Sequence, residues 1–245
     1  METAGQESAP AGATDDAAAL GAEPAFETAR KKLADIFKGE GRPLDILEVR
    51  SRHFATEVRM NYNDDFLDVL KPFVGGEKVL DIFAGSQKTR EFYEQEGLPV
   101  SVTSVDVTPG RADLAIDVAE IAKHIKPERQ FAFVFSFGGH PGFTDYEAIR
   151  DLLKDDGCLV TGASEEMFSA HELPALTIGE ARGQGPYEDE LREILKRFHP
   201  VATVRVRGIR GWYGPTIADK DNPEGAQDKV YVLWRKRKVD AGGAE

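Results

Sequence analysis

The stretch KVLDIFAGSQKTREF, residues 78–92, passes from an apolar run through a single glycine into a segment with helical spacing. A short run that is apolar on both faces is typical of a central strand in a parallel sheet that helices cover on both sides. The sequence therefore predicts a strand, a turn at Ala84, Gly85 and Ser86, and a helix. It also places the carboxylate of Asp81 near the end of that strand.

The same alternation of apolar runs and amphipathic segments continues toward the C-terminus. Further strands are predicted at 100–106, 112–116, 131–137 and 158–162, and helices at 89–96, 118–125, 145–153 and 187–198. Two β-prone segments, 202–212 and 229–237, follow with no helix between them, so we expect them to pair antiparallel. The predicted fold is α/β, with a doubly wound, mostly parallel seven-stranded sheet and a reversed last strand.

The chain divides into four predicted regions. Residues 1–24 and 239–245 have few large apolar side chains and are expected to be disordered tails. Residues 25–74 are expected to add N-terminal helices, at 26–37 and 53–73, as a possible lid. Residues 75–238 are expected to form the ligand-binding domain.

Composition excludes several classes of function. The chain has 245 residues and a net charge of -12, which disfavours a nucleic-acid surface because such a surface needs Lys and Arg to neutralise phosphates. No apolar run is long enough to span a membrane and no secretory signal is recognisable, so a cytoplasmic protein with a small-molecule substrate is expected. The single cysteine, Cys158, is expected in the core, and no metal site is predicted. Oligomeric state stays open.

The turn after residue 82 does not have the glycines of a phosphate-binding loop. A dinucleotide site needs G-x-G-x-x-G and a P-loop needs G-x-x-x-x-G-K-[ST], whereas this turn contains only Gly85. Pyrophosphate recognition is therefore poorly supported.

Three acidic residues end neighbouring predicted strands, namely Asp81, Asp106 and Asp117. In an open α/β sheet the ligand lies beyond the carboxyl ends of the strands, so we expect these carboxylates to face one crevice. A polyanion would be repelled there. A ligand with an ammonium, a sulfonium, a ribose diol and an adenine amine fits better, and S-adenosylmethionine has this set of groups.

With these residues, the chain resembles the class I S-adenosylmethionine-dependent methyltransferases, which have a Rossmann-like fold, over about residues 78–237. The resemblance implies that VLDIFAGS is the first cofactor motif, although Phe83 and Gln87 stand where glycines are usual. It implies cofactor contacts by the residues that follow each strand: Asp81, Ala84, Gly85 and Ser86, then Asp106 at the ribose hydroxyls with Val107 after it, Asp117 and Val118 at the adenine, and Ser136 and Phe137 at the methionine part.

Each acid also has a structural alternative. Asp81 suits a turn or capping role, and Asp106 precedes the turn residues Thr108, Pro109 and Gly110. Asp117 suits the N-cap of the helix VAEIAKHI.

The acceptor side is predicted from residues near the same edge. His140, in GGHPGF, is a candidate base because imidazole titrates near neutrality, and Tyr213 is a second catalytic candidate. Tyr62 and Arg59 on the N-terminal helix and Trp212 in GIRGWYGPT are candidate substrate-binding residues. Exposed or packing roles are the alternatives for all five.

The function expected first is methyl transfer to an O or N of a small metabolite. The segment FSFGGHPGF replaces the [DNS]-P-P-[YF] motif of nucleobase amine methyltransferases, which disfavours a nucleobase acceptor. Two alternatives remain open: a lyase or cyclase that consumes S-adenosylmethionine on the same fold, and a non-catalytic binding module. A nicotinamide-dependent reductase is disfavoured by the missing glycines.

Overall fold

The computed structural model describes residues 13–40, 46–51, 63–85, 87–127, 130–137, 144–164, 186–209 and 227–237. Within these ranges, no helix has both the length and the apolar character needed to cross a membrane.

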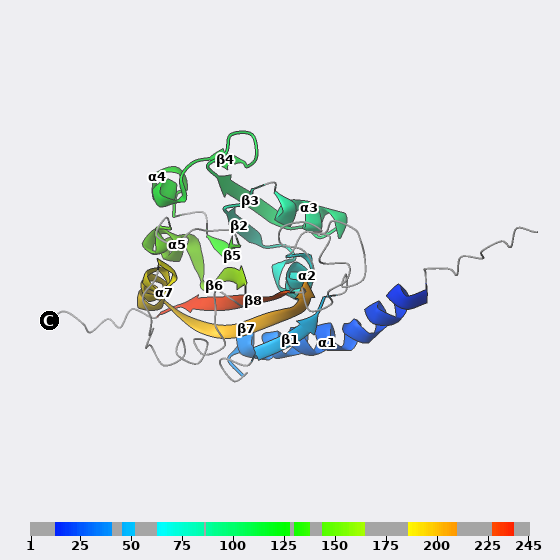
Figure 1. Ribbon diagram of the computed structural model, residues 1–245. Helices are drawn as coiled ribbons and strands as arrows, with labels where there is room; N and C mark the ends of the chain where they lie inside the picture. The colour runs from blue at the N-terminus through cyan, green and yellow to red at the C-terminus, as the bar shows by residue number, and fades with distance from the viewer. Residues whose placement is uncertain are drawn as a thin grey trace, which may run out of the picture.

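One eight-stranded sheet organises the chain (Figure 1). Its order is β1-β7-β8-β6-β5-β2-β3-β4, and β8 runs antiparallel to both of its neighbours while the other pairs are parallel. The strands are β1 (Ile46–Arg50), β2 (Lys78–Ile82), β3 (Ser101–Asp106), β4 (Leu114–Ala115), β5 (Phe131–Ser136), β6 (Leu153–Ser164), β7 (Phe198–Ile209) and β8 (Gln227–Lys236). The predicted doubly wound α/β sheet with a reversed last strand is confirmed.

Strand order reverses at β2. From β2 the chain builds outward to β3 and β4 on one side, then returns to β5 on the other side and continues to β6. The carboxyl ends of β2 and β5 therefore flank the switch point, which is the place where open α/β sheets bind ligands.

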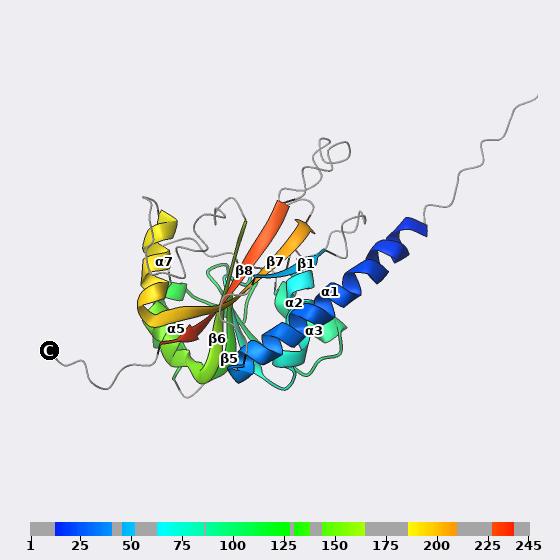
Figure 2. The same ribbon diagram turned by 90° about the horizontal axis from the view of Figure 1, so that it is seen from below.

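Helices cover both faces of the sheet (Figures 1 and 2). One face packs against α1 (Ala13–Lys38), α2 (Asp64–Val74) and α3 (Lys88–Gln95), with a core that includes Phe66, Phe135 and Tyr231. The other face packs against α4 (Ile121–His124), α5 (Tyr146–Leu152) and α7 (Pro186–Arg197), with a 3-10 turn, η1 (Val118–Glu120), before α4. Cys158 is buried, as predicted.

The N-terminal region differs from the prediction at the start of its first helix. Helix α1 begins at Ala13, inside the segment 1–24 that was expected to be disordered, because an alanine-rich run has high helix propensity even without large apolar side chains. Of the predicted helix 53–73, the described part is α2, and residues 52–62 lie outside the described residues.

The predicted number of seven strands is wrong because β1 was missed. This five-residue strand pairs in parallel with β7 and alternates exposed and buried side chains, with Leu47 and Val49 inside. Alternation over five residues gives a weak sequence signal, and the strand gains its stability from the neighbouring β7 and from α1.

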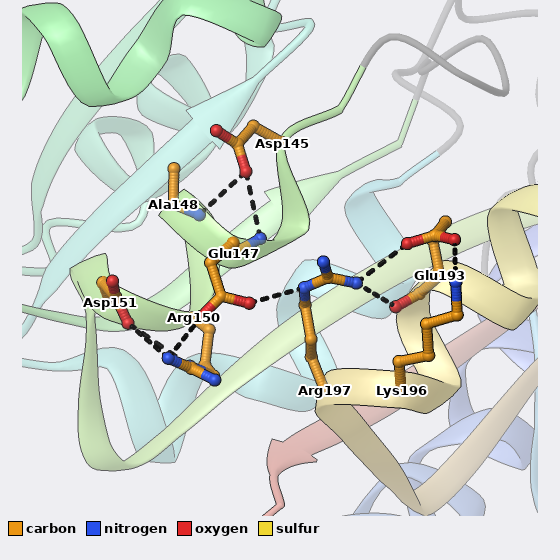
Figure 3. A network of polar contacts seen from close by, with 8 residues as sticks. All are labelled: Asp145, Glu147, Ala148, Arg150, Asp151, Glu193, Lys196 and Arg197. Atoms are coloured by element: carbon orange, nitrogen blue, oxygen red, sulfur yellow. Dashed lines mark hydrogen bonds and ion pairs between the residues drawn. The ribbon is translucent and has the colours of Figure 1, made fainter.

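A polar network joins α5 to α7 on the second face (Figure 3). Arg197 donates to Glu147 at 2.7 Å and to Glu193 at 2.9 Å, so its guanidinium links the two helices. Asp145 caps α5 by accepting from the backbone N–H groups of Glu147 and Ala148. The network fixes the helix that follows β5, one of the two strands at the switch point.

Candidate functional site

The turn after β2 keeps a glycine-type backbone with only one glycine. Phe83, Gly85 and Gln87 have φ values of 58°, 53° and 59°. Non-glycine residues rarely adopt this left-handed conformation, and each instance costs about 1–2 kcal/mol. The two non-glycine residues therefore follow the backbone path that the motif requires, and the surrounding contacts hold them there. Ser86 lies outside the described residues.

Asp106, at the end of β3, binds this turn directly. Its carboxylate accepts the N–H of Gly85 at 3.0 Å on one oxygen and the N–H of Thr108 at 2.8 Å on the other. The N–H of Ala84 donates to the carbonyl of Val105 at 3.0 Å, which joins the turn to the same strand. The amide that a phosphate-binding loop would present to a phosphate is thus directed at a carboxylate.

Asp106 is ionised and retains capacity for further hydrogen bonds. Partial burial alone would raise its pKa, but the hydrogen bonds from Thr108 and Gly85 and the charge of Arg111 outweigh burial, and the pKa is lowered. A carboxylate has about four acceptor positions, and the N–H groups of Gly85 and Thr108 and the side chain of Thr108 occupy three of them. The capacity that remains suits a hydroxyl donor such as that of a ribose.

Asp81 lies beneath the turn and is 4% exposed. Burial raises its pKa to about 7; a hydrogen bond with Thr89 and the charge of Arg90 act in the opposite direction, and the charge of Asp106 adds to the rise. Asp81 thus lies near enough to Asp106 to feel its charge, while the expectation that Asp81, Asp106 and Asp117 face one crevice stays a prediction. The carboxyl group of Asp81 is closed off from solvent. Direct contact between Asp81 and a cofactor stays a prediction.

Arg90, on the first turn of α3, connects three parts of the site. It donates to the side chain of Gln87 at 2.8 Å and to the carbonyl of Val102 at 2.6 Å, and it pairs with Asp113. Asp113 also accepts the N–H of Ser104 at 2.8 Å. This arginine therefore fixes the left-handed Gln87 against β3 and the segment before β4.

Replacing Arg90 tests this connection. We expect Arg90→Leu to lower the free energy of unfolding by about 1–3 kcal/mol, because hydrogen bonds to charged groups are lost and Asp113 keeps fewer donors. Arg90→Lys should recover only part of the loss, since an ammonium cannot reach all three acceptors. Urea denaturation measures the effect.

Lys88→Met is the matched control for Arg90. Lys88 lies on the same turn of α3 and makes an exposed pair with Glu91 at 2.6 Å, which contributes little. Equal stability of the wild type and Arg90→Lys would contradict the role of the guanidinium.

Val107, Asp117 and Val118, three of the predicted cofactor residues, differ in exposure. Val107 is 63% exposed immediately after Asp106, so an apolar surface is available at this edge. Asp117 accepts the N–H of Ala119 at 2.9 Å and so has the N-cap role that was its alternative, while its side chain stays exposed. Val118 is buried in the core cluster that includes Leu80, and its contact with the adenine stays a prediction.

Ser136 and Phe137 lie at the carboxyl end of β5, next to the end of β2. Both are nearly buried, and the ring of Phe137 stacks on Phe135 at 5.1 Å between centroids. The ring also meets Tyr231 edge-on at 5.6 Å. An aromatic cluster therefore underlies this part of the edge.

The remaining predicted site residues lie outside the described residues: Ser86, His140, Tyr213, Tyr62, Arg59 and Trp212. Their roles stay predictions. The sequence analysis missed Arg90 and the buried Lys229, which lies at the same edge. In the strand segment KVYVL, Lys229 shares a face with Tyr231 and Leu233, and this spacing of two was the available signal for Lys229.

No model of a known protein family matches this chain, and no curated protein matches its sequence. Solved structures are similar at low identity. A SAM-dependent methyltransferase from Thiobacillus denitrificans, in complex with S-adenosyl-L-homocysteine, has 12% identity and a TM-score of 0.45 over 76% of this chain and 97% of its own.

Two other solved structures are similar to a comparable degree. A SAM-dependent methyltransferase from Archaeoglobus fulgidus has 16% identity and a TM-score of 0.39, over 73% of this chain and 96% of its own. The cyclase SpnF has 14% identity and a TM-score of 0.42, over 89% of this chain and 96% of its own. Likenesses at this level do not establish an activity for this chain.

Proposed function

We propose that this protein is an S-adenosylmethionine-dependent methyltransferase that acts on an O or N of a small molecule. The observation that carries the proposal is the hydrogen bond from the Gly85 N–H to Asp106 at 3.0 Å. It directs the loop's amide at an anionic side chain, so the loop favours hydroxyl and cationic groups over a pyrophosphate.

The residues at the edge fit the parts of this cofactor. Asp106 would accept a ribose hydroxyl on its remaining acceptor capacity, and Val107 would provide apolar surface beside the adenine. The negative charge beneath the turn, at Asp81 when it is ionised, favours a cationic ligand. The cofactor supplies a methyl group on a positively charged sulfur.

A small acceptor is favoured by charge and by the requirements of the reaction. The net charge of -12 disfavours nucleic acid as the acceptor. Methyl transfer from a sulfonium depends mainly on alignment, which is worth about 7–11 kcal/mol in well-oriented systems, so few dedicated acid or base groups are needed. His140 and Tyr213 remain the proposed catalytic candidates on the acceptor side, with Tyr62, Arg59 and Trp212 as proposed contacts.

Transfer of labelled methyl tests the activity. The protein is incubated with methyl-labelled S-adenosylmethionine and the small-molecule fraction of a cell extract, and products are separated by chromatography. We expect labelled product with the wild type and a loss of product with Asp106→Ala.

A parallel incubation without extract separates the competing chemistry. Methylthioadenosine formed from the cofactor alone would contradict methyl transfer and indicate a lyase. Binding of the cofactor without any turnover in either incubation would indicate a non-catalytic module.

A further inference from the structure

A cavity lies at the edge of the sheet opposite the proposed cofactor site. Its volume is about 180 Å³, and its lining comes from the C-terminal end of α1, from α2, from the first residues of β5, from β6 and from the end of β8. Strands β2 and β5 begin at this edge, whereas the proposed cofactor residues follow the places where these strands end. A strand rises about 3.3 Å per residue, so β2 and β5 separate the two edges.

Three phenylalanine rings form one wall of this cavity. Phe37, near the end of α1, meets Phe73 of α2 edge-on, with 4.9 Å between ring centroids, and meets Phe133 of β5 at 6.3 Å. Such contacts fix the rings relative to one another and leave their outer surfaces for a further ring. Since a cavity of about 150 Å³ can accommodate benzene, this one has room for a single ring with a small substituent.

Arg235 provides a polar group in the same cavity. It lies near the end of β8, paired with Cys158 of β6 on one side and His199 of β7 on the other. Its Nη2 donates to the carbonyl of Phe37 at 3.0 Å, and its guanidinium lies 5.4 Å from the centre of the Phe37 ring. Arg235 thus holds its charge beside the aromatic wall.

The guanidinium of Arg235 has hydrogen-bonding capacity that the described residues do not use. Its Nε is buried and has no hydrogen-bond partner. The thiol of Cys158 also contacts Arg235, but sulfur is a weak acceptor. In the described ranges no acidic residue forms an ion pair with Arg235. A buried donor without an acceptor destabilises the folded protein, so an oxygen supplied by a ligand would stabilise it.

The charges around the cavity favour an anion at Arg235. Lys154 pairs with Glu77 at 2.5 Å, so the charge of this lysine is already compensated. Asp156 also lines the cavity and opposes an anion, but it is exposed and water and salt screen it. The planar fork of an arginine suits a carboxylate, which can accept two of its N–H groups at once.

We propose that this cavity binds a small aromatic carboxylate, with the carboxylate on Arg235 and the ring against the three phenylalanines. The site lies apart from the proposed cofactor site, and the inference does not depend on the proposed function. Neither half of the ligand suffices by itself: the rings favour an apolar partner, and the unused donor of Arg235 favours an oxygen acceptor.

Titration of the full chain with 4-fluorobenzoate, followed by ¹⁹F NMR at pH 7, tests the site. We expect a dissociation constant below about 1 mM, which is within reach of a ligand of this size. The neutral 4-fluorobenzamide has the same shape without the charge and should bind at least tenfold more weakly. Saturating S-adenosylhomocysteine should change the affinity for 4-fluorobenzoate by less than twofold, because the two sites are at opposite edges.

Two substitutions should change this affinity in opposite directions. Arg235→Gln should weaken binding of 4-fluorobenzoate at least tenfold, and its melting curve shows whether the variant is folded. Asp156→Asn should tighten binding about threefold, because it removes a negative charge from the cavity; the exposed position makes a folding defect unimportant. Lys123→Gln is the charge-matched control for Arg235→Gln, since Lys123 makes an exposed pair with Glu120 on the other face.

A change of volume without a change of charge gives a further check. Ala132 lines the cavity and is partly exposed, so Ala132→Leu should reduce the space and weaken binding at least fivefold, while Ala132→Ser should bind within twofold of the wild type.

The other outcomes would overturn the site. No saturable binding of 4-fluorobenzoate, equal binding of the amide, undiminished binding by folded Arg235→Gln, or displacement by S-adenosylhomocysteine would each do so.

Discussion

Asp81→Asn is expected to make the protein more stable at pH 8 while leaving its stability near pH 4 almost unchanged. The pKa of Asp81 is raised by burial from 3.8 to about 7 in the folded protein. Between these values the folded state holds a proton that the unfolded chain releases, so the stability of the wild type falls as the pH rises through this window. At about 1.4 kcal/mol per pKa unit, the full effect above pH 7 is about 4 kcal/mol.

Urea denaturation at pH 4, 6 and 8 measures this difference. Asp113→Asn is an instructive control, because hydrogen bonds from Arg90 and Ser104 outweigh the effect of burial and lower the pKa of Asp113. Ionised Asp113 stabilises the folded protein at pH values above the pKa that Asp113 has in the unfolded chain. The Asp113→Asn variant should therefore be less stable than the wild type at pH 8. An Asp81→Asn variant that is less stable than the wild type at pH 8 would contradict the description of Asp81 as a buried acid kept at a cost in stability.

Asp81→Asn should also weaken binding of the cationic cofactor at pH 8. Loss of the buried negative charge should lower the affinity for S-adenosylmethionine more than the affinity for S-adenosylhomocysteine, whose sulfur is uncharged. A gain in stability with a loss of cofactor affinity is the pattern expected of a residue retained for function.

Asp106→Asn is expected to weaken binding of S-adenosylhomocysteine by about 100-fold or more. The amide removes a charge that accepts from Gly85 and Thr108 and, in the proposed complex, from a ribose hydroxyl. Hydrogen bonds to charged groups contribute about 1.5–3 kcal/mol each, and two of them correspond to a change of this size. Isothermal titration calorimetry measures the dissociation constant directly.

Glu120→Gln is the charge-matched control for Asp106→Asn. Glu120 is exposed on the η1 turn and pairs with Lys123 at 2.7 Å. We expect less than a twofold change for this variant. Similar losses in both variants would indicate a general effect of charge rather than contact by Asp106.

Much of the fold follows from apolar runs in the sequence. The segments VLDIF and FAFVFS are apolar on both faces, which only central strands of a covered sheet require, and both form neighbouring strands at the switch point. The strand ILEVR was missed because it is short and lies at the sheet edge, where pairing with β7 rather than local propensity decides its conformation.

The site was less predictable than the fold. The acids Asp81 and Asp106 were identified from their positions after strands, but burial of the first and accessibility of the second depend on tertiary packing. The left-handed Phe83 and Gln87 run against residue preference, so only the motif pointed to them. Lys229 was missed because a lysine at the start of a strand is ordinarily solvated, and the packing of α2 over it is not encoded locally.

Calorimetric titration of the wild-type protein with S-adenosylhomocysteine and, separately, with a nicotinamide dinucleotide measures which ligand the loop after β2 accepts. Saturable one-to-one binding of S-adenosylhomocysteine, with no heat from the dinucleotide, is the predicted result. Binding of the dinucleotide in its place would show that the Gly85 amide serves a pyrophosphate after all.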